Sequence, residues 1–154
     1  MVSIIDRNKF KFINLPKEIH TTNSEEMLIK DNYDYVFECS GNENAINLCL
    51  RLVSRQGIIC VIGNPTKDIN FKEIEYSKLL RKEVTIKGSW NSSFKKENND
   101  DWISAHSAMQ KGFCPSKYVT HNLNLKTLPS FLKKCWEHKI RKKSFKHIKG
   151  VVIL

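Results

Sequence analysis

The sequence predicts an α/β protein built on a doubly wound parallel sheet. Three short apolar runs between residues 34 and 90 each stop at a glycine: YVFECSG (35–41), IICVIG (58–63) and VTIKG (84–88). Helical patterns separate these runs, and strands that alternate with helices indicate βαβ crossovers in a parallel sheet. Ligands of such sheets bind beyond the carboxyl ends of the strands, where a glycine lets them approach the backbone. The pattern therefore predicts a nucleotide-binding sheet edge.

The first 30 residues predict short elements. We expect strands over residues 2–5 and 19–22 and helices over residues 8–15 and 24–30. Pro16 stops the first helix because proline cannot donate the backbone hydrogen bond that a helix interior needs. Ser24 is a typical N-cap, and Glu25 and Glu26 would lie favourably in the first turn of the second helix.

The middle of the chain carries the clearest crossover. Residues 42–54 place a set of apolar side chains on one helical face, namely Ala45, Ile46, Cys49, Leu50, Leu52 and Val53. Gly57 is expected to end that unit before the next strand. Asn64 and Pro65 then predict a turn, and residues 74–81 predict a second helix before the strand at Val84.

The pattern changes after residue 112. Asp100 or Asp101 is expected to cap a helix over residues 102–110, with Gly112 at its end. Beyond it we expect a strand over residues 119–121, a helix over 128–138 capped by Thr127, and a closing strand over 151–154. A boundary near residues 112–118 divides the chain into a partial nucleotide-binding domain, residues 1–114, and a second segment, residues 115–154.

Composition excludes several classes of protein. The 154 residues are 40% hydrophobic and 27% charged, as in ordinary globular proteins, and no apolar stretch approaches the roughly 20 residues that span a bilayer. No secretory leader is apparent, so we expect a cytoplasmic protein without membrane contact. The five cysteines are odd in number and contain no CxxC pair, which argues against a disulfide framework or zinc knuckle.

The net charge of +10 leaves a second interpretation open. Many of the cations fall between Lys133 and Lys149 and could attract nucleic acid. No DNA-binding motif is visible among them, so a solvated helix face and loop are favoured. Glu38, inside an apolar strand, is interpreted as a satisfied buried or strand-end carboxylate rather than a catalytic acid or base.

Several blocks together resemble one family. DYVFECSG (34–41), IICVIGNP (58–65) and YSKLLRKEVTIKGSW (76–90), followed by Asp101-Trp102 and VTHNLNL (119–125), resemble the zinc-dependent medium-chain alcohol and polyol dehydrogenases. The third block is most similar to the galactitol-1-phosphate 5-dehydrogenase branch, with sorbitol dehydrogenases as the broader neighbour. The resemblance implies a Rossmann-like fold and an oxidoreductase that transfers hydride from a secondary alcohol, here a polyol or polyol phosphate, to NAD.

The resemblance also implies positions for a cofactor. Asp6 and Lys11 would face the adenosine ribose, and Asp6 would repel the 2′-phosphate of NADP. The other implied cofactor-binding residues are Ser40, Gly41, Ile62, Gly63 and Asn64 in the cleft, and Ser89, Trp90 and Asn91 beside the nicotinamide. The family pairs its subunits through its last sheet strand, so a homodimer through residues 84–89 is expected.

Departures from the family pattern restrict these expectations. The chain has no GxGxxG, and the family's glycine loop and zinc ligands lie earlier in its sequence than the part this chain matches. Pro16 stands where family members usually carry glycine. We therefore expect no catalytic residue and no metal ligand in this chain, and an inactive fragment whose missing first strand separates the strands at Ile4 and Val36. The alternative expectation is a pseudo-enzyme that dimerises with, or regulates, a full-length homologue.

Overall fold

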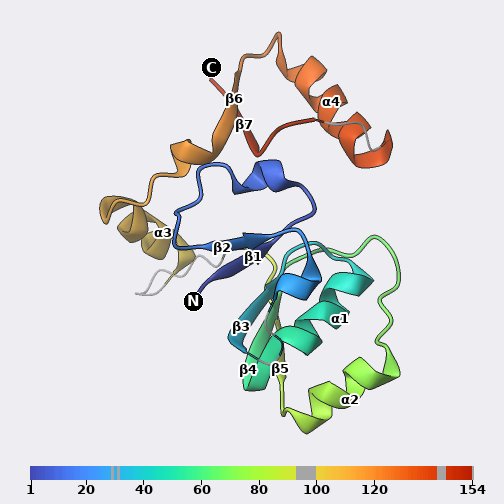
Figure 1. Ribbon diagram of the computed structural model, residues 1–154. Helices are drawn as coiled ribbons and strands as arrows, with labels where there is room; N and C mark the ends of the chain where they lie inside the picture. The colour runs from blue at the N-terminus through green and yellow to red at the C-terminus, as the bar shows by residue number, and fades with distance from the viewer. Residues whose placement is uncertain (29, 31, 93–99, 142–144, 154) are drawn as a thin grey trace. The chain divides into compact units, whose positions relative to one another are not determined.

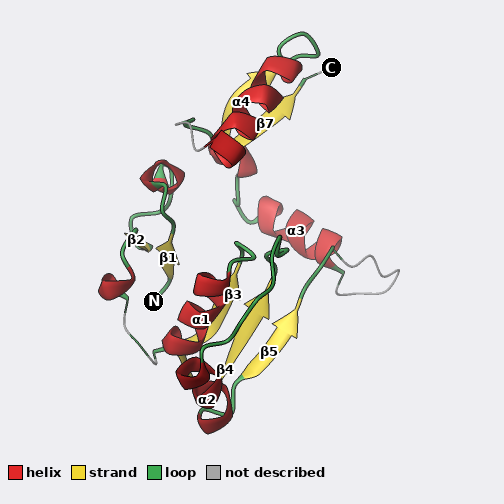
Figure 2. Cartoon of the chain, turned by 90° about the vertical axis from the view of Figure 1, so that its right-hand side faces the viewer, coloured by secondary structure: helices red, strands yellow, loops and turns green. Residues whose placement is uncertain are grey.

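The computed structural model describes residues 1–28, 30, 32–92, 100–141 and 145–153. Four pairs of neighbouring strands are formed among them, and all four are parallel (Figures 1 and 2). The chain divides into two compact units: Ser24–Ser93, and Met1–Asn23 together with Phe94–Leu154. No helix in the described ranges is long and apolar enough to cross a membrane.

The unit Ser24–Ser93 contains the predicted βαβαβ arrangement. Its strands are β3 (Tyr33–Glu38), β4 (Val53–Val61) and β5 (Thr85–Gly88), in that order across the sheet. The crossovers are α1 (Glu43–Leu52) and α2 (Glu73–Arg81). Both helices lie on the same face of the sheet (Figures 1 and 2). The predicted strands at the three glycine-terminated runs and both predicted helices are confirmed.

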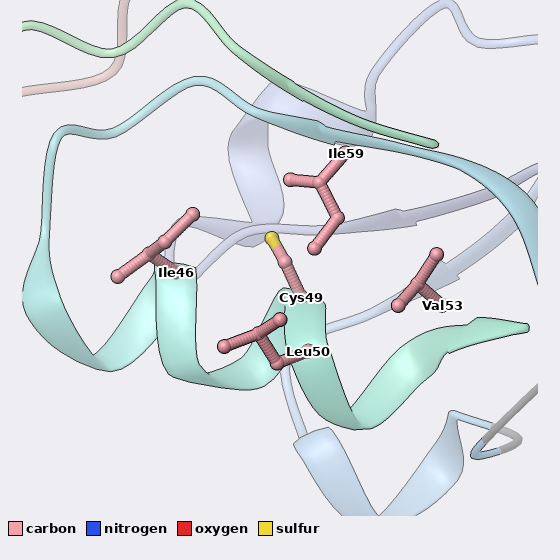
Figure 3. Close-up of a cluster of buried hydrophobic side chains, with 5 residues drawn as sticks. All are labelled: Ile46, Cys49, Leu50, Val53 and Ile59. Atoms are coloured by element: carbon pink, nitrogen blue, oxygen red, sulfur yellow. The ribbon is translucent and has the colours of Figure 1, made fainter. Parts of the chain in front are cut away.

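The core of this unit lies between α1 and the sheet. Its buried side chains are Ile46, Cys49, Leu50, Val53 and Ile59 (Figure 3). Leu50, Val53 and Ile59 are 0% exposed. Full burial of such a side chain stabilises a fold by roughly 1.5–3 kcal/mol. The apolar face predicted for residues 42–54 is therefore the face that packs on the strands.

Polar contacts fix both ends of α1. The side chain of Asn42 accepts a hydrogen bond from Asn44 N at 2.9 Å and caps the helix N-terminus. At the other end, Lys82 Nζ donates to the carbonyls of Leu50 and Val53, each at 2.8 Å. A cation there satisfies carbonyls that the helix leaves without partners.

Two sequence predictions in this unit are wrong. The helix expected from Ser24 is a single 3₁₀ turn, Glu25–Met27, because Leu28 is already extended and packs against Leu48 and Leu52. Residue 29 of that predicted helix lies outside the described residues. Gly57 does not separate α1 from the next strand. β4 begins directly after α1, and Gly57 lies inside β4.

The second unit begins with a small parallel sheet. β1 (Ser3–Ile5) pairs with β2 (His20–Thr22), as the sequence predicts, and the pair is a separate sheet from β3–β4–β5. The helix expected from Asn8 is a four-residue 3₁₀ helix, Lys9–Phe12, which the Asn8 side chain caps at Phe10 N.

The unit continues with α3 (Asp101–Gln110), for which the sequence offered either Asp100 or Asp101 as the N-cap. Asp100, 2% exposed, accepts a hydrogen bond from Ile103 N at 2.7 Å, so Asp100 is the N-cap. Gly112 follows the helix with φ +99°, the left-handed conformation typical of a helix C-terminus.

The chain closes with β6 (Val119–Leu123), α4 (Leu128–Arg141) and β7 (Lys149–Val152). α4 begins directly after Thr127, but the acceptor side chain at its start is that of Asn124 and not, as expected, that of Thr127. Asn124 Oδ1 accepts from Thr127 N, and the Thr127 hydroxyl accepts from Asn124 N, both at 3.0 Å. The last strand begins two residues earlier than expected. Of the late cations, Lys142 and Lys143 lie outside the described residues, while Lys133, Lys134 and Lys139 are exposed on α4.

Candidate functional site

The carboxylate of Glu38 organises the end of β3. Its side chain is buried, with the residue only 3% exposed. Its Oε1 accepts hydrogen bonds from Ser40 N at 2.8 Å, Ser40 Oγ at 2.6 Å and Gly41 N at 3.0 Å. Oε2 lies 3.1 Å from the same Gly41 N. Hydrogen bonds to an ionised acceptor are the strong class, so this loop is firmly held.

The loop after β4 is tied to the same residue. The carbonyl oxygen of Glu38 accepts from Ile62 N at 2.8 Å and from Gly63 N at 3.0 Å. These two bonds continue the β3–β4 pairing past the end of the strands. Residues 40–41 and 62–63, which the family resemblance assigns to one cleft, are thus brought together by the structure.

Both glycines are required for that contact. A Cβ on Gly63 would lie 2.0 Å from Gly41 N, and a Cβ on Gly41 would lie 2.4 Å from Asn64 O. Gly41 also has φ +64°, which L side chains rarely adopt. The two glycines therefore allow the two loops to touch, and the idea that they also admit a cofactor stays a prediction.

A cavity of about 170 Å³ lies beside these loops. Its lining combines two polar residues with apolar side chains from both helical crossovers and two strands: Glu38, Gly41, Asn42, Ile46, Val61, Gly63, Pro65, Ile69, Phe71 and Ile86. Pockets that enclose drug-sized ligands measure roughly 300–1,000 Å³. The cavity can therefore enclose only part of a ligand as large as a dinucleotide.

The cavity's wall is pinned to α1 by Asn47, which is 1% exposed. Its amide donates to Glu43 O and to Asn70 O, each at 2.9 Å, and its oxygen accepts from Lys72 N at 3.0 Å. Asn47 was not expected from the sequence to be part of the site. Its position next to the apolar face predicted for residues 42–54 could have indicated a buried polar side chain.

Asp6 and Lys11 lie together at the end of β1. Asp6 Oδ2 accepts from Lys11 Nζ at 2.8 Å, and Oδ1 accepts from Asn8 N at 2.8 Å. The Asp6 side chain is 29% exposed and that of Lys11 is 50% exposed. An ion pair this open contributes about 0–1 kcal/mol, so a ligand hydroxyl can replace the lysine at little cost.

The three residues after β5 remain exposed. Ser89 N donates to Val61 O at 2.9 Å and so extends the β4–β5 pairing by one residue. Trp90 is 71% exposed, and Ser89 and Asn91 are exposed as well. None of the three lines the cavity, but they follow the same carboxyl edge of the sheet as the loops after β3 and β4.

Two thiols near Glu38 have raised pKa values, which disfavours their thiolate forms. Burial raises the pKa of Cys49 to about 12, with a further contribution from the Glu38 carboxylate. The pKa of Cys39 is also raised, first by burial and then by Glu38 and Cys60. In the described part of the chain no three His, Cys, Asp or Glu side chains gather as a metal site requires, so these residues do not fit a zinc ion.

Comparisons with known proteins agree on one family. Residues 12–111 match the sequence model of the zinc-binding dehydrogenases. L-threonine 3-dehydrogenase of Vibrio vulnificus is 26% identical over 100 residues, which are 65% of this chain and 27% of that enzyme. The same enzyme from Vibrio parahaemolyticus is 26% identical over 113 residues, covering 73% of this chain and 31% of its own length. The chain thus spans about a third or less of these curated relatives.

Solved structures show the same fold. L-idonate 5-dehydrogenase of Escherichia coli superposes with a TM-score of 0.72 at 18% identity, covering 99% of this chain and 42% of that enzyme. Galactitol-1-phosphate dehydrogenase of Escherichia coli gives 0.64 at 18% identity, covering 80% and 38%. These likenesses establish the Rossmann-like parallel fold, and the match over residues 12–111 establishes the family. The chain belongs to the zinc-binding dehydrogenase family.

Proposed function

We propose that this chain carries part of the cofactor site of an NAD-dependent polyol or polyol-phosphate dehydrogenase of the galactitol-1-phosphate type. The observation that carries the proposal is the pair of joined loops, Ser40–Gly41 and Ile62–Asn64, at the carboxyl edge of a parallel sheet within the family match. Ligands bind at that edge in folds of this class. When bound, NAD would supply the hydride acceptor for the oxidation of a secondary alcohol.

Asp6 supports NAD as the nucleotide. Its carboxylate lies at the end of a parallel strand, and its hydrogen-bond donors among the described residues are the exposed Lys11 and the backbone N–H of Asn8. Such a carboxylate accepts hydrogen bonds from ribose hydroxyls and repels a 2′-phosphate. In this proposal Lys11 releases Asp6 and contacts the ribose or the adjacent phosphate. Two structural relatives are described as bound to NADP, so the preference of this chain for NAD over NADP is tested by titration with both nucleotides.

The remaining cofactor residues have separate proposed roles. Ser40, Gly41, Ile62, Gly63 and Asn64 form the backbone wall of the cleft. Ser89, Trp90 and Asn91 flank the nicotinamide, because they follow β5 at the same edge. The polyol substrate is inferred from the resemblance of residues 76–90 and agrees with the sugar-derived substrates named for two structural relatives.

We also propose a homodimer through residues 84–89. Among the described residues β5 pairs with β4 alone, and Thr85 to Gly88 are exposed. An unpaired strand edge is a template for pairing with a second chain. We further propose a domain boundary between residues 114 and 115. Residues 115–154, which contain β6, α4 and β7, would then be a segment of the catalytic domain.

Fluorescence titration with NADH tests the proposal. Bound nicotinamide near Trp90 should quench tryptophan emission saturably, and Trp90→Phe should remove most of the quenching while Trp136→Phe, on α4, should not. NADPH should need a higher concentration for the same effect. Absence of saturable quenching at millimolar NADH, or equal loss in both variants, would contradict it.

A further inference from the structure

Glu38 is an unusual buried anion because it has no cationic partner among the described residues. Its carboxylate is satisfied by Ser40 N, Ser40 Oγ and Gly41 N instead. A buried charge is costly unless it is hydrogen-bonded. The local backbone is therefore arranged around this one acceptor group.

The same residue controls both loops of the candidate site. Its side chain holds Ser40 and Gly41, and its carbonyl oxygen holds Ile62 and Gly63. A Cβ on Gly63 would lie 2.6 Å from Glu38 Oε2, so the carboxylate also forms the surface against which Gly63 packs. From this geometry we infer that Glu38 is a positioning residue for the nucleotide: it sets the relative placement of the loops after β3 and β4.

The nucleotide in this inference rests on the proposed function. The placement of the two loops by Glu38 does not depend on it. Oε1 receives three of the four contacts from these donors and Oε2 receives one. A glutamine can keep its oxygen at the Oε1 position and lose only the longer Gly41 contact. Alanine loses all of them. Glu38→Gln should therefore rescue what Glu38→Ala destroys.

Glu75 provides a matched control. It is also buried, at 6% exposure, but it lies in α2 and pairs with Lys78 at 2.9 Å and with Arg51 at 3.7 Å. It contacts neither loop. Glu75→Ala removes a buried carboxylate from the same unit and so reports the general cost of that change.

Amide hydrogen exchange of the full chain, without nucleotide, tests the positioning. Glu38→Ala should speed exchange at Ser40 and Gly41 by about tenfold or more, as expected when hydrogen bonds to a charged group are lost. Glu38→Gln and Glu75→Ala should leave these two amides within about threefold of wild type. If Glu38→Ala does not fold, Ser40→Ala, which removes only the 2.6 Å hydroxyl contact, should still speed exchange at Gly41. Unchanged exchange in both variants would overturn the inference.

The NADH titration is the second arm. If the wild type responds to NADH, Glu38→Ala should weaken the response about tenfold and Glu38→Gln by less, with Glu75→Ala unchanged. Faster exchange with undiminished NADH affinity would overturn the inference. A wild type that ignores NADH would refute the proposed function, and the exchange result would then show separately whether Glu38 places the loops.

Discussion

Two strand-end carboxylates, Asp6 after β1 and Glu38 at the end of β3, have opposite surroundings. Glu38 is 3% exposed and bonded to the donors of its own loop, whereas the Asp6 side chain is 29% exposed and bonded to one lysine and one backbone N–H. The buried group is committed to structure. The open group has partners that water or a ligand can replace. A carboxylate at a strand end therefore does not have a fixed role. Its role depends on the groups that donate hydrogen bonds to it.

The largest expected change in stability comes from Gly63→Ala, in the loop after β4 that Glu38 holds. Its Cβ would lie 2.0 Å from Gly41 N, so the backbone of one loop must move. We expect a loss of more than about 3 kcal/mol of unfolding free energy, within the range of severe core substitutions. Urea denaturation measures it. Gly88→Ala is the control, because nothing lies within 4 Å of its Cβ, and it should change stability by less than about 0.5 kcal/mol. Similar losses in both variants would remove the argument for joined loops.

The second effect concerns the thiols around Glu38. Cys49 has a pKa of about 12, that of Cys39 is raised, and that of exposed Cys114 is lowered, chiefly by a hydrogen bond with the Ser116 hydroxyl. Because the thiolate is the reactive species, Cys114 should react with a thiol reagent at pH 8 about 100-fold faster than Cys49. Mass spectrometry of labelled peptides gives the order. Labelling of Cys49 at a rate near that of Cys114 would contradict the burial of Cys49 between α1 and the sheet.

A third pair of variants compares the two carboxylates directly. Ser40→Ala removes a 2.6 Å hydrogen bond to the buried Glu38 and should cost about 1.5–3 kcal/mol. Lys11→Met removes the exposed partner of Asp6 and should cost less than about 1 kcal/mol. Thermal unfolding of both variants measures the difference. An equal cost would mean that the two carboxylates are held alike.

The smallest effect is on nucleotide choice. Asp6→Asn keeps the size of the side chain and removes the charge that would repel a 2′-phosphate. We expect the preference for NADH over NADPH to fall by about tenfold, with stability changed by less than about 1 kcal/mol. Parallel titrations with the two nucleotides show it. An unchanged preference would exclude Asp6 from the ribose site.

Much of the fold could be predicted from sequence because its signals are local. The apolar face of residues 42–54, the glycine at the end of each strand run and the acidic cap before α3 depend on spacing within one element. The helix from Ser24 failed because its decisive contact is distant: Leu28 packs on Leu48 and Leu52 in an extended conformation.

The site was predicted less completely. The family resemblance grouped Ser40, Gly41, Ile62 and Gly63 in one cleft, and the structure brings these residues together. Glu38 was expected to be a satisfied buried or strand-end carboxylate, and it is buried at the end of β3, but the donors that satisfy it could not be named from the sequence. Those bonds depend on the left-handed turn at Gly41 and on the backbone of a second loop.

The account's central claim is that the Asp6 carboxylate responds to a nucleotide, whereas the Glu38 carboxylate stays fixed and positions the loops after β3 and β4. Carboxylate and amide NMR shifts recorded during an NADH titration of the full chain test this most directly. The account predicts saturable shifts at the Asp6 carboxylate and at the amides of Ile62, Gly63 and Asn64, with the Glu38 carboxylate unchanged. Shifts at the Glu38 carboxylate without any at Asp6 would contradict it.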